Sequence, residues 1–98
     1  MATYIVLGNF TDHGIRTVNE TTRRADAFKD LAKSLGVSVK EIFWTLGSFD
    51  TVTIVDAPDE ASITALGLAL GKAGNLRTQT LRAFSRGEIE AILKKFSS

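Results

Sequence analysis

The side chains that most often carry out catalysis or hold metal ions are scarce in this sequence. It has no cysteine and a single histidine, His13. Because a zinc site usually needs three or four ligands, one histidine cannot build one. We therefore expect no metal site and no cofactor. His13 could still ligate a haem or act as a base, but the pattern favours a solvated residue at the start of a helix.

The arginines and acids offer one further candidate site. Arg82 lies among threonines in a predicted strand, and its planar guanidinium suits carboxylate and phosphate groups. It either receives an anionic ligand or pairs with an acid, for which Asp50 and Glu41 are candidates, and we favour pairing. Asp50 itself is expected to hydrogen-bond N–H groups of a turn rather than to catalyse a reaction. The adjacent Arg23 and Arg24 are expected on a solvated helix edge.

Composition limits the classes of partner. Lys and Arg number 12 and Asp and Glu number 11, which leaves a net charge of +1. This balance gives no electrostatic footprint for nucleic acid or for a membrane surface. No apolar run is long enough to span a bilayer, and the first residues lack the pattern of a signal peptide. We expect a cytoplasmic protein with one domain spanning residues 1–98.

The residue pattern predicts alternating strands and helices. Strands are expected at 3–10, 37–46, 49–57 and 76–84. Helical spacing is found among Ile15, Val18, Thr22, Ala25, Phe28, Leu31, Ala32 and Leu35, then among Ile63, Leu66, Leu70 and Ala73, and last among Ile89, Ile92, Leu93 and Phe96. The order is βαββαβ with a C-terminal helix, which is the ferredoxin-like α+β arrangement with a four-stranded antiparallel sheet. Two right-handed crossovers place both main helices on one face of this sheet.

Individual residues refine the predicted elements. Poor helix formers before Thr22 predict a frayed or kinked first half of the first helix. Gly36 is expected to end that helix in the left-handed conformation, and Gly47-Ser48 to form a short hairpin connection. Gly67 and Gly71 favour close packing of the second helix on the sheet. A capping box, Ser85-Arg86-Gly87-Glu88, starts the last helix.

Strand alternation divides the sheet into two faces. The face toward the helices is predicted to hold Ile5, Leu7, Ile42, Trp44, Val52, Ile54, Leu81 and Ala83. The opposite face is predicted to hold Tyr4, Val6, Gly8, Phe10, Phe43, Thr45, Thr51, Thr53, Val55, Thr78, Thr80 and Arg82. This second set mixes aromatic and hydroxyl groups as ligand sites do, although threonine pairs are also ordinary in sheets. The resulting ligand-pocket prediction comprises Tyr4, Asn9, Phe43, Thr45, Thr53, Thr78, Thr80 and Arg82.

Two of the predicted strands are apolar on both faces. YIVL at 4–7 and VTIV at 52–55 show this pattern, and such strands must be covered on both sides. Because the two main helices cover one face, we expect a second copy of the chain to cover the other. The expected partner is therefore the chain itself, as a homodimer or higher homo-oligomer. The alternative is that the C-terminal helix folds back over that face.

Three segments resemble one known family. YIVLGNFTD (4–12), WTLGSFD (44–50) and GNLRTQTLRAF (74–84) together are similar to the GYD domain family, named for a glycine–tyrosine–aspartate signature. Here the signature region is Gly47-Ser48-Phe49-Asp50, with phenylalanine where tyrosine is usual. The resemblance implies a dimeric α+β barrel, in which two sheets pack face to face, and it implies no established activity.

Three functions fit these observations. The first is a non-enzymatic oligomeric domain that binds a small ligand or a partner in the cavity between the sheets. The second is a cofactor-independent oxygenase or isomerase that acts on a small aromatic substrate, for which the candidate groups are Tyr4, Asn9, Thr45, Thr80 and Arg82. The third is a haem-binding barrel, and it rests on His13 alone. The sequence assigns no catalytic residue, so enzymatic activity is left open.

Overall fold

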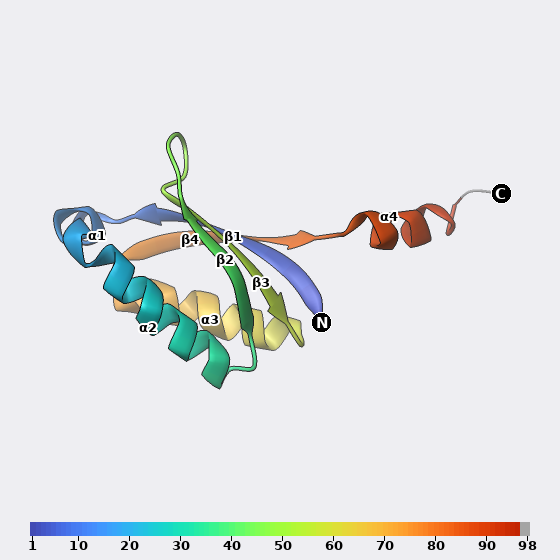
Figure 1. The fold of residues 1–98 in the computed structure, drawn as a ribbon, viewed down its shortest axis with the longest axis horizontal. Coiled ribbons are helices and arrows are strands. Elements are labelled where there is room, and N and C mark those ends of the chain that lie inside the picture. The colour runs from blue at the N-terminus through green and yellow to red at the C-terminus, as the bar shows by residue number, and fades with distance from the viewer. Residues whose placement is uncertain (97–98) are drawn as a thin grey trace.

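Runs rich in β-branched residues form one antiparallel sheet in the computed structural model, which describes residues 1–96 (Figure 1). The elements in chain order are β1 (Ala2–Phe10), α1 (Asp12–Arg16), η1 (Val18–Glu20), α2 (Thr21–Ser34), β2 (Ser38–Trp44), β3 (Thr51–Ala57), α3 (Glu60–Ala73), β4 (Leu76–Ala83) and α4 (Arg86–Leu93). Within the described residues the sheet has 4 strands in the order β2-β3-β1-β4. Helices α2 and α3 cover one face. The predicted ferredoxin-like α+β fold with a C-terminal helix is confirmed.

The first helical region is broken, as its residues predict. Helix α1 ends at Arg16, and Thr17 leaves the helical conformation with φ −111° and ψ 28°. A turn of 3₁₀ helix follows, and α2 then runs without interruption from Thr21. Glycine and β-branched threonines lower helix propensity in this first part. Gly36, with φ +74°, follows α2 in the left-handed conformation.

Local capping also sets the other two helices. The Asp59 carboxylate accepts a hydrogen bond of 2.7 Å from the Ser62 N–H and caps α3. Gly74, with φ +83°, ends the same helix. The predicted capping box at the start of α4 is confirmed, because both the Ser85 and the Glu88 side chains accept from the backbone of the other residue. Short-range hydrogen bonds therefore define these helix ends.

The predicted assignment of the sheet faces is wrong for β1, β3 and β4. The core beneath the helices comprises Tyr4, Val6, Ala32, Val37, Val55, Ala57, Ile63 and Leu66. Thr51 and Thr53 are buried on the same side. In β2 alone the prediction holds, because Ile42 and Trp44 face α2. Alternation separates two sets of residues but does not say which set faces the helices, and a shift of one residue exchanges them.

The reversed assignment leaves an apolar surface on the side without helices. We call this the open face, and it consists of Ile5, Leu7, Phe43, Val52, Ile54 and Leu81. Phe43 is 49% and Leu81 is 40% exposed, and the other members are partly exposed. The strand side chains beneath the helices include the hydroxyl-bearing Thr51 and Thr53 together with the aromatic Tyr4, Phe10 and Trp44. The apolar side chains of the open face have no helix over them among the described residues.

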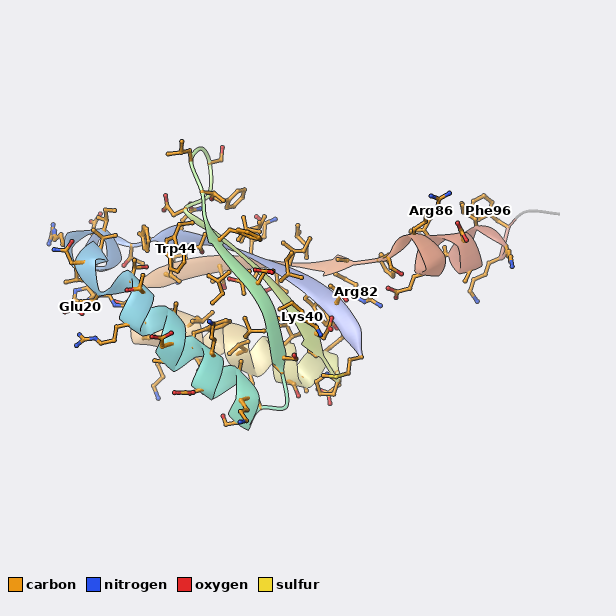
Figure 2. All side chains as sticks on the ribbon, viewed as in Figure 1. Glu20, Lys40, Trp44, Arg82, Arg86 and Phe96 are labelled. Atoms are coloured by element: carbon orange, nitrogen blue, oxygen red, sulfur yellow. The ribbon has the colours of Figure 1, made fainter. Side chains whose placement is uncertain are left out.

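Helix α4 does not supply that cover. It projects away from the sheet on the end of β4 (Figures 1 and 2), and the molecule is 55 Å long as a result. Its apolar side chains Ile89, Leu93 and Phe96 are 41%, 47% and 76% exposed. The arrangement in which the C-terminal helix folds back over the open face is not the one found.

Two predicted local contacts differ in the structure. The connection between β2 and β3 is longer than Gly47-Ser48 and spans 45–50, where the Thr45 N–H donates to the Asp50 carbonyl at 2.8 Å. Gly47 does have the expected positive φ, +106°. Gly67 and Gly71 do not pack closely on the sheet, because a Cβ added at either position would meet nothing within 4 Å.

Strand β2 is an irregular edge of the sheet. Its register with β3 shifts between Val39 and Glu41, so Lys40 is left out of the pairing. The Lys40 ammonium lies 3.4 Å from the Asp56 carboxylate. That carboxylate also accepts a 2.7 Å hydrogen bond from the Thr3 hydroxyl. The Thr3 bond first, and then Lys40, lower the pKa of Asp56.

Candidate functional site

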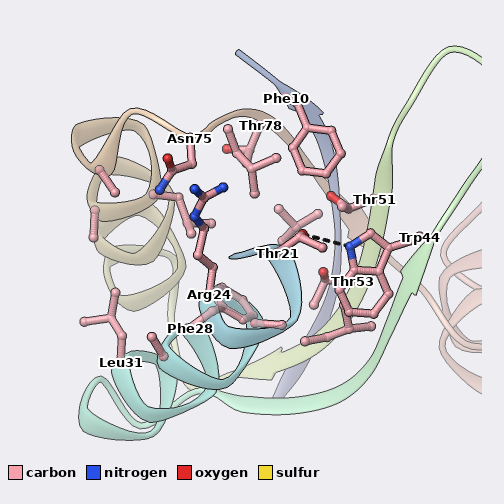
Figure 3. A pocket seen from close by; sticks show the side chains of 18 residues that line it. Phe10, Thr21, Arg24, Phe28, Leu31, Trp44, Thr51, Thr53, Asn75 and Thr78 are labelled. Atoms are coloured by element: carbon pink, nitrogen blue, oxygen red, sulfur yellow. Dashed lines mark hydrogen bonds between the residues drawn. The ribbon is translucent and has the colours of Figure 1, made fainter. Parts of the chain in front are cut away.

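A cavity of about 230 Å³ lies between the helix layer and the sheet (Figure 3). Its walls are largely apolar, and among the lining residues are Phe10, Phe28, Leu31, Ile42, Trp44 and Leu70. Thr51, Thr53 and Thr78 contribute hydroxyl groups from the strands. Ligand sites commonly combine apolar walls with a few placed polar groups. We call this space the Arg24 cavity, after the one charged side chain among the described residues that line it.

Helical spacing brings Arg24 into the cavity. Residues three or four apart share a helix face, so Thr21, Arg24, Phe28 and Leu31 lie together on the side of α2 toward the sheet. Nη2 of Arg24 donates to the hydroxyl of Thr17, at the break between α1 and η1. Nη1 of Arg24 is buried and has no hydrogen-bond partner among the described residues.

Asn75 is the second polar group of interest in the cavity. Its Oδ1 is buried and likewise has no hydrogen-bond partner in the described part of the chain. Thr11 holds this segment in place, because its hydroxyl donates to the Gly74 carbonyl at 2.6 Å and its N–H donates to the Asn75 carbonyl at 3.1 Å. Gly14 lets the backbone of α1 come close, since a Cβ there would lie 2.0 Å from the Asn75 carbonyl oxygen.

Trp44 forms a partly exposed wall of the cavity. The side chain is 45% exposed, and its indole N–H donates to the Thr21 hydroxyl at 3.0 Å. Figure 3 shows this hydrogen bond across the opening between β2 and α2. Trp44 is the only tryptophan of the sequence. The tryptophan fluorescence of the protein therefore comes from one wall of this cavity.

The structure disperses the residues predicted to form a ligand pocket. Thr53 and Thr78 line the Arg24 cavity, and Thr80 lines a shallower hollow between α3 and β4. Tyr4 is buried in the core. The others lie elsewhere: Asn9 and Phe43 point to the open side, Thr45 is in the connection after β2, and Arg82 is near the end of β4. The structure thus brings Thr53 and Thr78 together in the cavity, and it places Tyr4 beside Arg82 on the paired strands β1 and β4, with the guanidinium carbon 5.8 Å from the centroid of the Tyr4 ring.

The groups considered for an oxygenase or isomerase do not share one cavity. The lining of the Arg24 cavity includes none of Tyr4, Asn9, Thr45, Thr80 and Arg82, and of these five Thr80 alone lines the shallower hollow.

Among residues 1–96 no cluster of three or more metal-binding side chains occurs. No helix in that part of the chain has the length and apolar character needed to cross a membrane.

Arg82 pairs with an acid, but with neither of the predicted ones. Its Nη2 lies 3.0 Å from Oε2 of Glu88, at the start of α4. Its guanidinium also stacks over the ring of Phe84, 4.4 Å from the centroid. The pKa of Glu88 is lowered, first by the Ser85 N–H of the capping box and then by Arg82. Sequence reasoning missed Glu88 because it assigned this acid to the capping box alone.

Asp50 has a structural role like the one predicted. Its Oδ2 accepts a 2.8 Å hydrogen bond from the Phe10 N–H, and its own N–H donates to the Gly8 carbonyl at 2.8 Å. The bonds go to β1 rather than to the turn itself, so Asp50 ties the end of the β2–β3 connection to the neighbouring strand. His13 is exposed on α1.

Arg24 is the polar side chain that sequence reasoning misplaced. We predicted both Arg23 and Arg24 on a solvated helix edge. Arg23 fits this prediction, with a side chain 77% exposed and an ion pair of 2.7 Å to Glu20. Arg24 instead turns toward the sheet. The signal that could have identified it is its spacing of four and seven residues from the apolar Phe28 and Leu31.

Comparisons of the sequence with known proteins gave a family match and a relative. A sequence model of the family described as "GYD domain" matches residues 4–93. A protein from Thermus thermophilus is 35% identical over 95 residues, which cover 96% of this chain and 100% of that protein. That relative is named "Glutamine synthetase and cystathionine beta-lyase binding protein".

Proposed function

Since the chain belongs to the GYD domain family, and a relative similar over its whole length is named as a binding protein for two enzymes, we propose that it is a protein-binding module. In this proposal it self-associates through its open face, and the assembly binds a metabolic enzyme such as glutamine synthetase or cystathionine beta-lyase. The single observation that carries the enzyme-binding part is the full-length similarity to that relative.

The composition of the open face supports self-association. Contiguous exposed apolar patches on a soluble protein mark interaction sites. The apolar residues of this face extend from β2 to β4 and include the half-exposed Phe43 and Leu81. An apolar patch of this kind can match another copy of itself, because a twofold dimer brings the same patch together on both subunits. The charged Glu41, Asp56 and Arg77 lie on the same side of the sheet. Two sheets packed in this way lie about 10 Å apart with their side chains interdigitated.

The projecting helix α4 supports the same proposal. Its apolar side chains Ile89, Leu93 and Phe96 are exposed, and α4 lies away from the sheet and from the other helices of residues 1–96. A helix of eight residues is marginal in water without packing on another surface. We propose that α4 packs on the second copy, next to the face that the two sheets share. Association then buries both apolar surfaces that the single chain leaves exposed.

Light scattering of the purified full-length chain tests self-association. We expect a dimer or higher oligomer for the natural sequence and a folded monomer for Leu7→Glu, which puts a charge in the middle of the open face. The matched control is Leu68→Glu, because Leu68 is 70% exposed on α3 and lies away from that face. A monomeric natural chain, or a Leu7→Glu variant that still associates, would contradict the proposal.

Enzyme binding needs a separate measurement. The full chain is titrated against purified glutamine synthetase and purified cystathionine beta-lyase of its own organism, with an unrelated oligomeric enzyme as the control. We expect saturable binding to at least one of the two. Binding to neither, by a chain that is folded and self-associated, would refute the enzyme-binding part and leave the open face as an interface between copies.

A further inference from the structure

We propose that the Arg24 cavity binds a free α-amino acid with an apolar side chain. In this complex the carboxylate of the amino acid pairs with Arg24, its ammonium group donates to Oδ1 of Asn75, and its side chain lies against the apolar walls. This inference goes beyond the protein-binding function and does not depend on it. The cavity lies beneath the helices, on the opposite side of the sheet from the open face.

The unpaired nitrogen of Arg24 indicates an anion. A buried cationic group is costly unless it is paired and hydrogen-bonded. Nη1 of Arg24 is buried without a partner, and no acidic side chain is among the described residues that line the cavity. Since Nη2 is held by Thr17, the guanidinium is fixed with Nη1 free. A carboxylate oxygen is the acceptor whose geometry a guanidinium matches well.

The unpaired oxygen of Asn75 indicates a donor in the same ligand. Buried acceptors nearly always have a hydrogen-bond partner, yet Oδ1 of Asn75 has none among the described residues. Arg24 and Asn75 both line the cavity (Figure 3), one with a cationic donor and the other with an acceptor, and they do not bond to each other. A simple carboxylate would satisfy only Arg24. An amino acid carries both the acceptor and the donor, so it satisfies both side chains.

The walls of the cavity indicate an apolar side chain on that amino acid. Phe28 and Leu31 of α2 and Leu70 of α3 face Ile42 across a space of about 230 Å³. Burial of apolar ligand surface against such walls is favourable by about 25 cal/mol per Å². The single positive charge in the lining argues against a phosphate ester, which carries about two negative charges. Leucine and phenylalanine are therefore the natural probes.

Calorimetry and Trp44 fluorescence on the full-length chain test the proposal. The probes are L-leucine, L-phenylalanine, 3-phenylpropionate without the ammonium group, 2-phenylethylamine without the carboxylate, and phenyl phosphate. We expect one or both amino acids to bind and to shift the emission of Trp44, which lines the cavity. Each probe that lacks one of the two charged groups should bind at least roughly tenfold more weakly than phenylalanine, because it leaves one buried polar group unpaired.

Two variants and a matched control connect that binding to the cavity. Arg24→Leu should weaken amino-acid binding by roughly tenfold or more, while Arg23→Leu, one residue away on the solvent side, should leave it unchanged. Asn75→Ala should remove the preference for phenylalanine over 3-phenylpropionate. The proposal is overturned if neither amino acid binds, if phenyl phosphate or 3-phenylpropionate binds as tightly as phenylalanine, or if Arg24→Leu binds normally. The natural chain and its probes decide the question even if a variant fails to fold, and light scattering reads out self-association independently.

Discussion

Gly14 sits where the backbone of α1 meets the turn between α3 and β4. A Cβ at this position would lie 2.0 Å from the Asn75 carbonyl oxygen and 2.9 Å from its carbonyl carbon. Both atoms belong to the backbone, so no side-chain rotation relieves the overlap. Gly14 does not have a positive φ. Alanine is therefore unfavourable at this position because its Cβ lacks space, and not because of the backbone conformation. Gly14→Ala must therefore push α1 away from this turn.

The expected cost follows from the contacts that this movement breaks. Overpacking a close contact costs about 1–3 kcal/mol, and losing the Thr11 N–H to Asn75 hydrogen bond adds about 0.5–1.5 kcal/mol. Alanine recovers about 0.4–1 kcal/mol by restricting the unfolded chain. The net loss is on the order of 2 kcal/mol, which lowers the unfolding temperature of a domain of this size by roughly 8–16 °C.

Urea and thermal unfolding followed by circular dichroism measure this loss, at one protein concentration because association shifts apparent stability. The matched control is Gly71→Ala in α3, where a Cβ would meet nothing within 4 Å, and it should gain about 0.4–1 kcal/mol. If Gly14→Ala is as stable as the natural chain or gains as much as Gly71→Ala, the close approach of α1 to Asn75 is refuted.

Further outcomes follow from the other contacts. Asp50→Ala removes the acceptor for a part-buried N–H of β1 and should lower the free energy of unfolding in urea by about 1–3 kcal/mol. Asp50→Asn keeps an acceptor oxygen, so its loss of stability should be smaller. Equal losses for the two variants would contradict this role of Asp50. The Thr3 hydrogen bond and Lys40 lower the pKa of Asp56 below its usual 3.8. The ionised Asp56 carboxylate therefore stabilises the fold fully above pH 3.8, and this contribution is lost as the pH falls through the folded-state pKa. Asp56→Asn should therefore lose less unfolding temperature on acidification than the natural chain, and an unchanged acid profile would refute the assignment. Deletion of residues 86–98 should leave the urea unfolding of the monomeric Leu7→Glu background unchanged, because α4 has no buried residue; a clear destabilisation would show that α4 packs on its own protomer.

The features predicted correctly are those set by neighbours along the chain. The kink near Thr17 follows from the low helix propensity of the residues around it. Gly36 adopts a positive φ because it has no Cβ to clash in that conformation. The Ser85–Glu88 capping box follows from two reciprocal hydrogen bonds. Strand periodicity, with a crossover helix after β1 and another after β3, sufficed for the fold class. Each of these signals acts over a few residues, so the sequence displays it directly.

The features that were missed depend on which face of an element is buried and on contacts between residues far apart in the sequence. Both faces of β1 are apolar, so hydrophobicity could not decide whether Val6 or Leu7 points to the helices. Arg23 and Arg24 are chemically identical neighbours, and only the rotation of α2 against the sheet separates a solvated side chain from one in a cavity. Asn75 gave no signal of a role in the cavity, because the burial of its Oδ1 depends on packing between segments that are far apart in the sequence.

The shift in register at Lys40 affects how these molecules can aggregate. A sheet grows into a fibre only when both of its outer strands offer a regular row of free N–H and C=O groups to the next molecule. In this protein β2 is interrupted within its length and carries a lysine there, so β4 is the one regular edge of the sheet in residues 1–96. A single chain therefore offers one regular edge for pairing with a strand of another molecule, which is half of what a continuous cross-β fibre requires of each member.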